Sequence, residues 1–261
     1  MAQSSSSFAA TRAPRPRAVR LRDALDERPL RGTFQEFDTP AVTELLGLAG
    51  ADFVVVDGEH GTFPIDRLED YVRAGAAAEA AVLYRAASSN DQLARILDAG
   101  FAGIVVPRVE SAEQARAIVD ATRFPPVGSR GLGPGRAGGY GLALDDLRTR
   151  GNDEALVVAM VETKAGLAAV EQIAAVPGID AIMIGPADLA SSLDVEPSSA
   201  ELAAAIDHIR DATLAAGTHA SVHCADAADI ERREAEGYRL LPASIDAALL
   251  FAAAAPLFTG R

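Results

Sequence analysis

The sequence predicts an α/β fold, a (β/α)₈ TIM barrel with a parallel eight-stranded core. From residue 32 onward, short apolar runs alternate with Ala-, Leu- and Glu-rich stretches that have helical character. Several of these runs are continuously apolar, as expected for parallel strands covered on both faces. Eight strand-then-helix repeats fill about 240 residues, close to the usual size of such a barrel, about 250 residues. A doubly wound open sheet is the alternative, but no Gly-x-Gly-x-x-Gly turn follows the first predicted strand.

The strands are expected where the apolar runs are richest in β-branched residues. These runs cover residues 32–37, 53–60, 81–85, 103–109, 156–162, 181–189, 219–224 and 238–244. Helix starts lie between them. Thr39 precedes Pro40 as an N-cap, and Ser111 with Gln114 forms a capping-box pattern. Glycines follow three predicted helices, at Gly50, Gly100 and Gly217.

The chain divides into a short tail and one catalytic domain. Residues 1–20 are rich in Ser and Arg, and we expect a disordered tail there, an organellar transit peptide being the alternative. Residues 21–261 form the single predicted barrel. Residues 126–147 are too long and too rich in glycine for a tight connection, so they are predicted to be a mobile loop or lid.

Composition excludes several classes of partner. The formal net charge of −13 disfavours nucleic acid and anionic membranes, because phosphate would repel this surface. No apolar run approaches the roughly 18 residues that a membrane span requires. Cys224 is the only cysteine, which rules out an internal disulfide and favours a reducing, cytoplasmic location. We therefore expect a small-molecule substrate.

Polar residues gather where the predicted strands end. The carboxyl ends of barrel strands form the active-site face, so polar side chains there indicate chemistry. The residues concerned are Asp57, Glu59 and His60 on the second strand, Arg85 on the third, Glu162 on the fifth and Asp188 on the sixth.

Glu162 and Asp188 are the candidate metal ligands. They come from neighbouring strands, where two carboxylates would repel each other unless a cation lies between them. Oxygen ligands with positions left for water and substrate suit Mg²⁺, Mn²⁺ or Co²⁺. The alternative is structural: Glu162 pairs with Lys164 or Arg85, and Asp188 caps the next helix.

His60 is the candidate base, because its ordinary pKa suits proton transfer near neutral pH. Asp98, at the end of a predicted helix, is placed to orient or support its imidazole, or else is an ordinary helix-terminal acid. Arg85 offers a cationic fork for a carboxylate or enolate oxygen.

In combination these residues resemble the HpcH/HpaI family of metal-dependent class II pyruvate aldolases, which includes 2-dehydro-3-deoxyglucarate aldolases. The resemblance runs from about residue 30 to the end of the chain. It rests on DGEH at 57–60, Arg85, ILDAG at 96–100, VPRVESAEQARAIVDATRFPP at 106–126, SRGLG at 129–133, VET at 161–163 and IGPADL at 184–189.

The resemblance implies a role for each site residue. His60 would be the base, Arg85 the transition-state stabiliser and Asp98 the group that raises the basicity of the histidine. Glu162 and Asp188 would hold the divalent metal. Substrate would be bound by Arg85, Gly185, Ala187 and Asp188, with Ala187 offering its backbone amide to the substrate carboxylate.

Three positions depart from the family pattern. Met160 stands where a glutamine usually contacts the substrate, and Arg85 precedes Ala86 where proline is usual. The SRGLG loop continues as PGRAGGYG, which is richer in glycine than is typical. These changes bear on the substrate more than on the metal and the base.

The expected reaction is reversible cleavage of a 4-hydroxy-2-oxo acid to pyruvate, or a related 2-oxo acid, and an aldehyde. Three alternatives remain open: a Schiff-base aldolase through Lys164, the only lysine; a CoA-ester lyase of the same superfamily; and a non-catalytic barrel scaffold.

Two further segments carry expectations. Residues 245–258 are more apolar than an outer barrel helix requires, so a homo-oligomer is expected, and the resemblance implies a trimer or hexamer. His219, His223 and Cys224 lie close together in the chain, but we expect packing there in preference to a second metal site.

Overall fold

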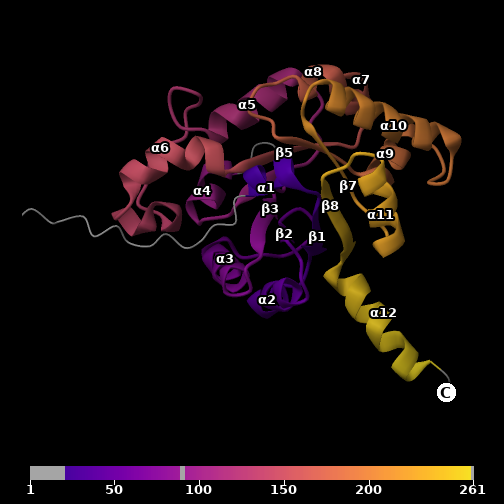
Figure 1. Ribbon diagram of the computed structural model, residues 1–261, viewed down its shortest axis with the longest axis horizontal. Coiled ribbons are helices and arrows are strands. Elements are labelled where there is room, and N and C mark those ends of the chain that lie inside the picture. The colour runs from indigo at the N-terminus through magenta and orange to yellow at the C-terminus, as the bar shows by residue number, and fades with distance from the viewer. Residues whose placement is uncertain (1–20, 89–91, 260–261) are drawn as a thin grey trace, which may run out of the picture.

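Eight parallel strands close into a barrel, with each strand hydrogen-bonded to the next in chain order and β8 to β1 (Figure 1). The computed structural model describes residues 21–88 and 92–259. The predicted (β/α)₈ fold is confirmed, and the tail expected at residues 1–20 lies outside the described residues. The strands are β1 (Leu30–Gln35), β2 (Phe53–Asp57), β3 (Ala81–Arg85), β4 (Gly103–Val106), β5 (Leu156–Val161), β6 (Ala181–Ile184), β7 (His219–Val222) and β8 (Leu240–Ile245).

Six strands, β1, β2, β4, β5, β6 and β7, end before the residues at which their predicted runs end. The runs 53–60, 103–109, 156–162 and 181–189 include polar residues that lie beyond the strands, in the loops of the carboxyl face. On β6 the reason is local, since Pro186 begins a helix directly after the strand. The residues that sequence patterning placed inside strands are therefore site-forming loop residues.

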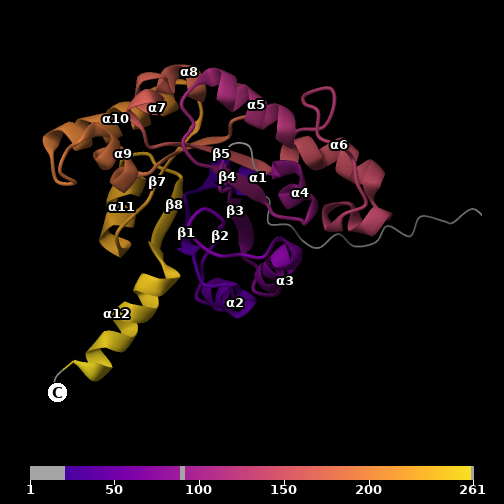
Figure 2. The same cartoon turned by 180° about the vertical axis from the view of Figure 1, so that it is seen from behind.

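The described helices lie mostly around the barrel, and the last of them projects away from it (Figures 1 and 2). They are α1 (Leu21–Glu27), α2 (Pro40–Leu48), α3 (Leu68–Ala77), α4 (Leu93–Asp98), α5 (Ala112–Thr122), α6 (Leu144–Glu154), α7 (Lys164–Ala168), α8 (Val170–Ala174), α9 (Pro186–Leu193), α10 (Ala200–Ala215), α11 (Ala227–Ala235) and α12 (Asp246–Phe258). Two short 3₁₀ helices, η1 (Ile65–Arg67) and η2 (Arg136–Gly141), complete the set.

The predicted helix boundaries are largely present. The Ser111 hydroxyl accepts a hydrogen bond from the Gln114 backbone N–H, and the Gln114 side chain accepts one from Glu110 N–H. Thr39 occupies the N-cap position before Pro40 but makes no side-chain capping bond. Gly50, Gly100 and Gly217 adopt positive φ angles of 98°, 97° and 76°, which explains why glycine ends these helices.

Alternation along the strands separates two apolar layers. Phe53 and Val55 of β2 belong to the cluster that fills the barrel, whereas Val56 packs in the layer between strands and helices. The same parity puts Leu83 of β3 inside the barrel. Continuing it toward the carboxyl ends makes Asp57 and Arg85 the next inward residues.

The segment 126–147 combines loop with helical turns. It contains η2, and α6 begins within it at Leu144. The Ser129 and Arg130 backbone N–H groups donate to the carbonyls of Asp120 and Arg123, and the Arg130 side chain is buried. These contacts attach the start of the segment to α5, and its action as a mobile lid stays a prediction. None of the described helices is long and apolar enough to cross a membrane.

Candidate active site

The carboxyl ends of β2 and β3 carry a buried ion pair. Asp57 and Arg85 are register partners on these neighbouring strands. Arg85 Nε donates to Asp57 Oδ1 at 2.8 Å and Nη2 donates to Oδ2 at 2.5 Å, a bidentate arrangement. Arg85 Nη1 lies 3.4 Å from Glu59 Oε2. The guanidinium is therefore fixed in direction before any substrate arrives.

The two charges stabilise each other's ionised forms. Burial by itself would raise the pKa of Asp57, but hydrogen bonds and charge from Arg85 outweigh it and hold the pKa below its ordinary value. Burial would lower the pKa of Arg85, and the bonds from Asp57 reverse that effect. Asp57 is a positioning residue that sequence reasoning placed on the rim but did not assign to the site.

Asp57 also shapes the loop that carries His60. Its Oδ1 accepts hydrogen bonds from the backbone N–H groups of Glu59 at 3.0 Å and His60 at 3.3 Å. The Asp57 carboxylate thus fixes both the orientation of the Arg85 guanidinium and the backbone of the loop that carries His60. The exposed His60 side chain lines the same cavity as Arg85.

Glu162 follows β5 and is 3% exposed. Its Oε1 accepts a hydrogen bond from the Arg108 backbone N–H at 2.8 Å, while its Oε2 is buried without a hydrogen-bond partner. Burial, together with the negative charges of Asp188 and Glu59, raises the pKa of Glu162 to about 7. Buried carboxylate oxygens normally contact a hydrogen-bond donor or a cation, so Glu162 Oε2 has the capacity to accept either one.

The turn after β6 leaves room beside that oxygen. A Cβ on Gly185 would stand 2.6 Å from Glu162 Oε2, so any larger residue there would require this carboxylate to shift. Pro186 then begins α9, which places Ala187 and Asp188 in its first turn. Ala187 and Asp188 are exposed and line the cavity with Gly185. The four predicted substrate-binding residues, which also include Arg85, therefore line one cavity.

The donor set fits a hard divalent cation. Two carboxylates follow the neighbouring strands β5 and β6 at the rim, and one of them has an unpartnered buried oxygen. Within the described ranges, no group of three or more His, Cys, Asp or Glu side chains is arranged to hold a metal. The predicted site uses only two protein ligands, with water and substrate oxygens filling the rest.

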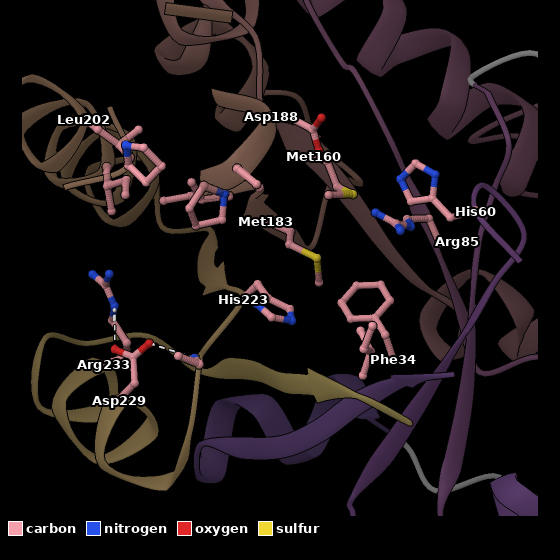
Figure 3. Close-up of a pocket in the computed structure, with 18 residues that line it drawn as sticks. Phe34, His60, Arg85, Met160, Met183, Asp188, Leu202, His223, Asp229 and Arg233 are labelled. Carbon is pink, nitrogen blue, oxygen red and sulfur yellow. Dashed lines mark hydrogen bonds and ion pairs between the residues drawn. The ribbon is translucent and has the colours of Figure 1, made fainter. Parts of the chain in front are cut away.

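The cavity extends well beyond these groups. It holds about 580 Å³. Figure 3 shows His60 and Arg85 on one side and Asp229 and Arg233 on the other, with His223 between them. Sequence reasoning missed these last three residues as site residues, because nothing local distinguishes His223 or an acid and an arginine on α11.

The comparisons with known proteins agree with this geometry. The chain matches the HpcH/HpaI aldolase/citrate lyase family over residues 31–253. The chain belongs to this family. It is 36% identical to the hydroxypyruvate/pyruvate aldolase of Chromohalobacter salexigens, over 88% of this chain and 92% of that protein.

Solved structures of the family superpose closely. An HpcH/HpaI aldolase/citrate lyase family protein from Burkholderia cenocepacia has a TM-score of 0.85 and 30% identity, covering 91% of this chain and 96% of that one. The citrate synthase SbnG has a TM-score of 0.83 and 29% identity, covering 91% and 95%. The relatives named aldolases confirm the predicted carbon–carbon lyase and do not favour the citrate-lyase-like alternative over the aldolase.

Two predicted roles lack a matching contact within this HpcH/HpaI chain. Asp98 Oδ1 accepts a hydrogen bond from Arg130 Nη2 at 2.7 Å, and among the described residues no hydrogen bond joins Asp98 to His60. The hydrogen bond from Arg130 supports the alternative interpretation, in which Asp98 is an ordinary helix-terminal acid. Lys164 is exposed at the start of α7 and does not line the cavity, which disfavours the Schiff-base alternative.

The remaining histidines are not gathered into a second metal site. His219 Nε2 lies 3.1 Å from Asp26 Oδ1, whereas His223 Nε2 lies 3.3 Å from the Ser244 carbonyl oxygen. Cys224 is buried, and burial raises the pKa of its thiol to about 12. The expectation of packing in this region agrees with these contacts.

Proposed function

We propose that this HpcH/HpaI protein is a class II aldolase acting on 4-hydroxy-2-oxo acids. It would cleave the bond between C3 and C4 reversibly, releasing pyruvate or a related 2-oxo acid such as hydroxypyruvate, together with an aldehyde. In cleavage, the 4-hydroxyl loses its proton, its oxygen becomes the aldehyde oxygen, and C3 gains a proton. No oxidant or reductant is required.

The observation that carries this proposal is the unpartnered Oε2 of Glu162. A buried carboxylate oxygen without a donor is costly, and here it lies beside Gly185, where a side chain would crowd it. Both carboxylates would hold a divalent cation, Mg²⁺, Mn²⁺ or Co²⁺. Such an ion would supply positive charge for the carboxylate and keto oxygens of the substrate and for the charge that develops on cleavage.

The chain's own residues would do the rest. His60 would accept the proton of the 4-hydroxyl, and the Arg85 guanidinium would stabilise negative charge on the keto oxygen. Because Asp57 already fixes Arg85, this donor needs no reorganisation during the reaction. The Ala187 backbone N–H, in the first turn of α9, would bind the substrate carboxylate.

The test is a metal add-back assay on stripped protein. A panel of 4-hydroxy-2-oxo acids should release pyruvate only when Mg²⁺, Mn²⁺ or Co²⁺ is restored. His60→Ala should lower turnover by about 10²-fold or more while metal binding persists. Glu171→Gln, at an exposed carboxylate paired with His208, is the matched control and should behave as wild type. Full activity in stripped protein, or in His60→Ala, would refute the assignment.

We also propose a homo-oligomer, a trimer or hexamer, whose subunits meet through α12. This helix projects away from the barrel (Figures 1 and 2). It leaves Leu250, Phe251, Leu257 and Phe258 between 60% and 78% exposed. Sedimentation should show an assembly larger than a monomer at micromolar concentration. A cytoplasmic location remains the prediction made from the single cysteine, to be checked by fractionation.

A further inference from the structure

The cavity offers more room than pyruvate alone fills. At about 580 Å³ it lies in the range of pockets that enclose drug-sized ligands, and a second hollow of about 350 Å³ adjoins it, sharing Pro197, Leu202, Ile206 and Arg233. His60, Arg85 and Asp188 occupy only one side (Figure 3). The opposite side is available to the rest of the substrate, which in an aldol reaction is the aldehyde.

Much of the cavity lining is apolar, and it includes Phe34, Met160, Met183, Ile184 and Ile245. Between the two charged ends lies His223, whose Nε2 is near the Ser244 carbonyl (Figure 3). Burial, reinforced by the positive charge of Arg85, lowers the pKa of His223, so the imidazole is neutral at neutral pH. This stretch therefore presents no net charge to a ligand.

The far end contains charges that already compensate one another. Asp229 Oδ2 accepts from the Ala225 N–H at 3.0 Å, and its Oδ1 contacts Arg232 and lies 3.5 Å from Arg233 Nε. Glu236 pairs with both arginines at 3.0 Å. Two carboxylates thus balance two guanidinium groups. Arg233 Nε has no hydrogen-bond partner, but both guanidinium groups are already paired with carboxylates, so a carboxylate or phosphate arriving here would compete with an existing partner for each charge.

Apolar residues complete this end. Leu202 and Ile206, on α10, are 3% and 6% exposed and face the cavity with Pro197. Burying a charged group against them would carry a desolvation cost that the compensated cluster does not repay. Burying methylene groups there is favourable.

From this lining we infer that the aldehyde partner of the reaction is uncharged and carries an aliphatic or aromatic chain, which occupies the end formed by Pro197, Leu202 and Ile206. This inference rests on the proposed aldolase function and names its substrate class. In the synthetic direction a methyl C–H of pyruvate is lost, a carbon–carbon bond forms to the aldehyde carbon, and the aldehyde oxygen gains a proton.

The test compares three aldehydes with pyruvate as donor and the metal-loaded protein as catalyst. Hexanal should exceed propanal by about fourfold in kcat/KM for each added methylene that is buried. Hexanal should also exceed 6-oxohexanoate, of the same length but with a terminal carboxylate, by at least about tenfold. A preference for 6-oxohexanoate, or no preference between it and hexanal, would overturn the inference.

Two variants test the charge balance. Asp229→Asn keeps an oxygen for the Ala225 N–H but leaves the cluster with an excess positive charge. It should raise kcat/KM for 6-oxohexanoate relative to hexanal by about three- to fivefold. Glu236→Gln makes the same change from outside the cavity and should act in the same direction, so it serves if Asp229→Asn fails to fold. If a folded variant had the wild-type ratio of kcat/KM for 6-oxohexanoate to that for hexanal, the charge balance of this cluster would not determine which aldehyde is preferred.

A separate measurement distinguishes failure of this inference from failure of the proposed function. Wild-type protein with metal should exchange the methyl protons of pyruvate with deuterated water even without an aldehyde. Exchange combined with a preference for the charged aldehyde would refute the substrate class alone. Absence of both exchange and condensation would refute the aldolase proposal, and the substrate class with it.

Discussion

Both the base of the barrel and its carboxyl rim contain buried charged side chains, but the two regions differ in how completely these charges are paired. At the base, Asp180 pairs with Arg22 at 2.8 Å and Arg123 at 2.9 Å, and it also accepts from the Val157 N–H. Arg123 further donates to the carbonyls of Ala155 and Gly178. At the rim, Glu162 retains an oxygen with no hydrogen-bond partner.

This difference in pairing distinguishes charges that stabilise the fold from charges that are available to a ligand. Buried charges that are fully paired hold elements together, and here they tie α1 and β6 to the end of α5. A buried charge left partly unpaired costs free energy in the empty protein and is retained where a ligand completes it. The same barrel therefore pairs the charges at its base and leaves one carboxylate oxygen at its rim without a partner, where we propose that a metal binds.

The largest effect is expected from Glu162→Gln. Removing this carboxylate charge should lower aldol cleavage by about 10³-fold or more, because several kcal/mol of metal-dependent stabilisation is lost. Calorimetric titration of Mn²⁺ should show weakened binding, while unfolding of the stripped variant should require at least as much urea as wild type. If the variant bound Mn²⁺ with wild-type affinity, Glu162 would not be a metal ligand and the contrast between base and rim would not hold.

Asp180→Ala should produce the opposite pattern at the base. It leaves Arg123, 2% exposed, as a buried cation without its carboxylate. We expect a loss of about 3 to 5 kcal/mol in the free energy of unfolding, with kcat/KM unchanged at a temperature where the protein is folded. Asp26→Ala, which removes only the exposed pair with His219, is the control and should cost under about 1 kcal/mol.

The pH dependence of stripped protein sharpens the comparison. Because the folded-state pKa of Glu162 rises from 4.5 to about 7, the folded state holds a proton that the unfolded state releases. This contribution is fully present below about pH 4.5 and is lost as the pH rises through 7, about 3 kcal/mol in all. Urea unfolding at pH 5 and pH 8 should show this loss in wild type but not in Glu162→Gln. Equal pH dependence in both would contradict it.

Asp57→Asn tests the positioning of Arg85 and His60. The substitution keeps one acceptor oxygen but removes the bidentate carboxylate, so the guanidinium should lose its fixed direction. We expect kcat to fall by about 10- to 100-fold, with metal affinity unchanged. If kcat stayed at the wild-type value, Asp57 would be structural only.

Met160→Gln should have the smallest effect. Met160 is 3% exposed and lies beside Gly185, in the wall where the family usually has glutamine. A restored hydrogen bond should lower KM for the 2-oxo acid by about two- to tenfold. Met183→Gln, at a similarly buried cavity position, should give no such gain. An increase in KM for Met160→Gln would show that the methionine suits a different donor.

Much of the candidate site could be predicted from the amino-acid sequence alone. The strands could be located because parallel strands covered on both faces are continuously apolar, and their carboxyl ends are where a barrel collects polar groups. His60, Arg85, Glu162 and Asp188 were selected on that ground, and all four lie on the rim. The helical turns and the Arg130 contacts within residues 126–147 could not be predicted, because glycine content indicates backbone freedom and does not reveal that Arg130 is buried against Asp98 and the Phe124 ring.

The sequence alone determined the order of strands and helices, their glycine ends and the residues at the strand ends, because these depend on local periodicity and backbone preference. Only the tertiary structure decided the partners: Asp57 for Arg85, Arg130 for Asp98, and the placement of His223, Asp229 and Arg233 around one cavity. These contacts join segments far apart in the chain. Their identity depends on the register and closure of the barrel, which no local pattern encodes.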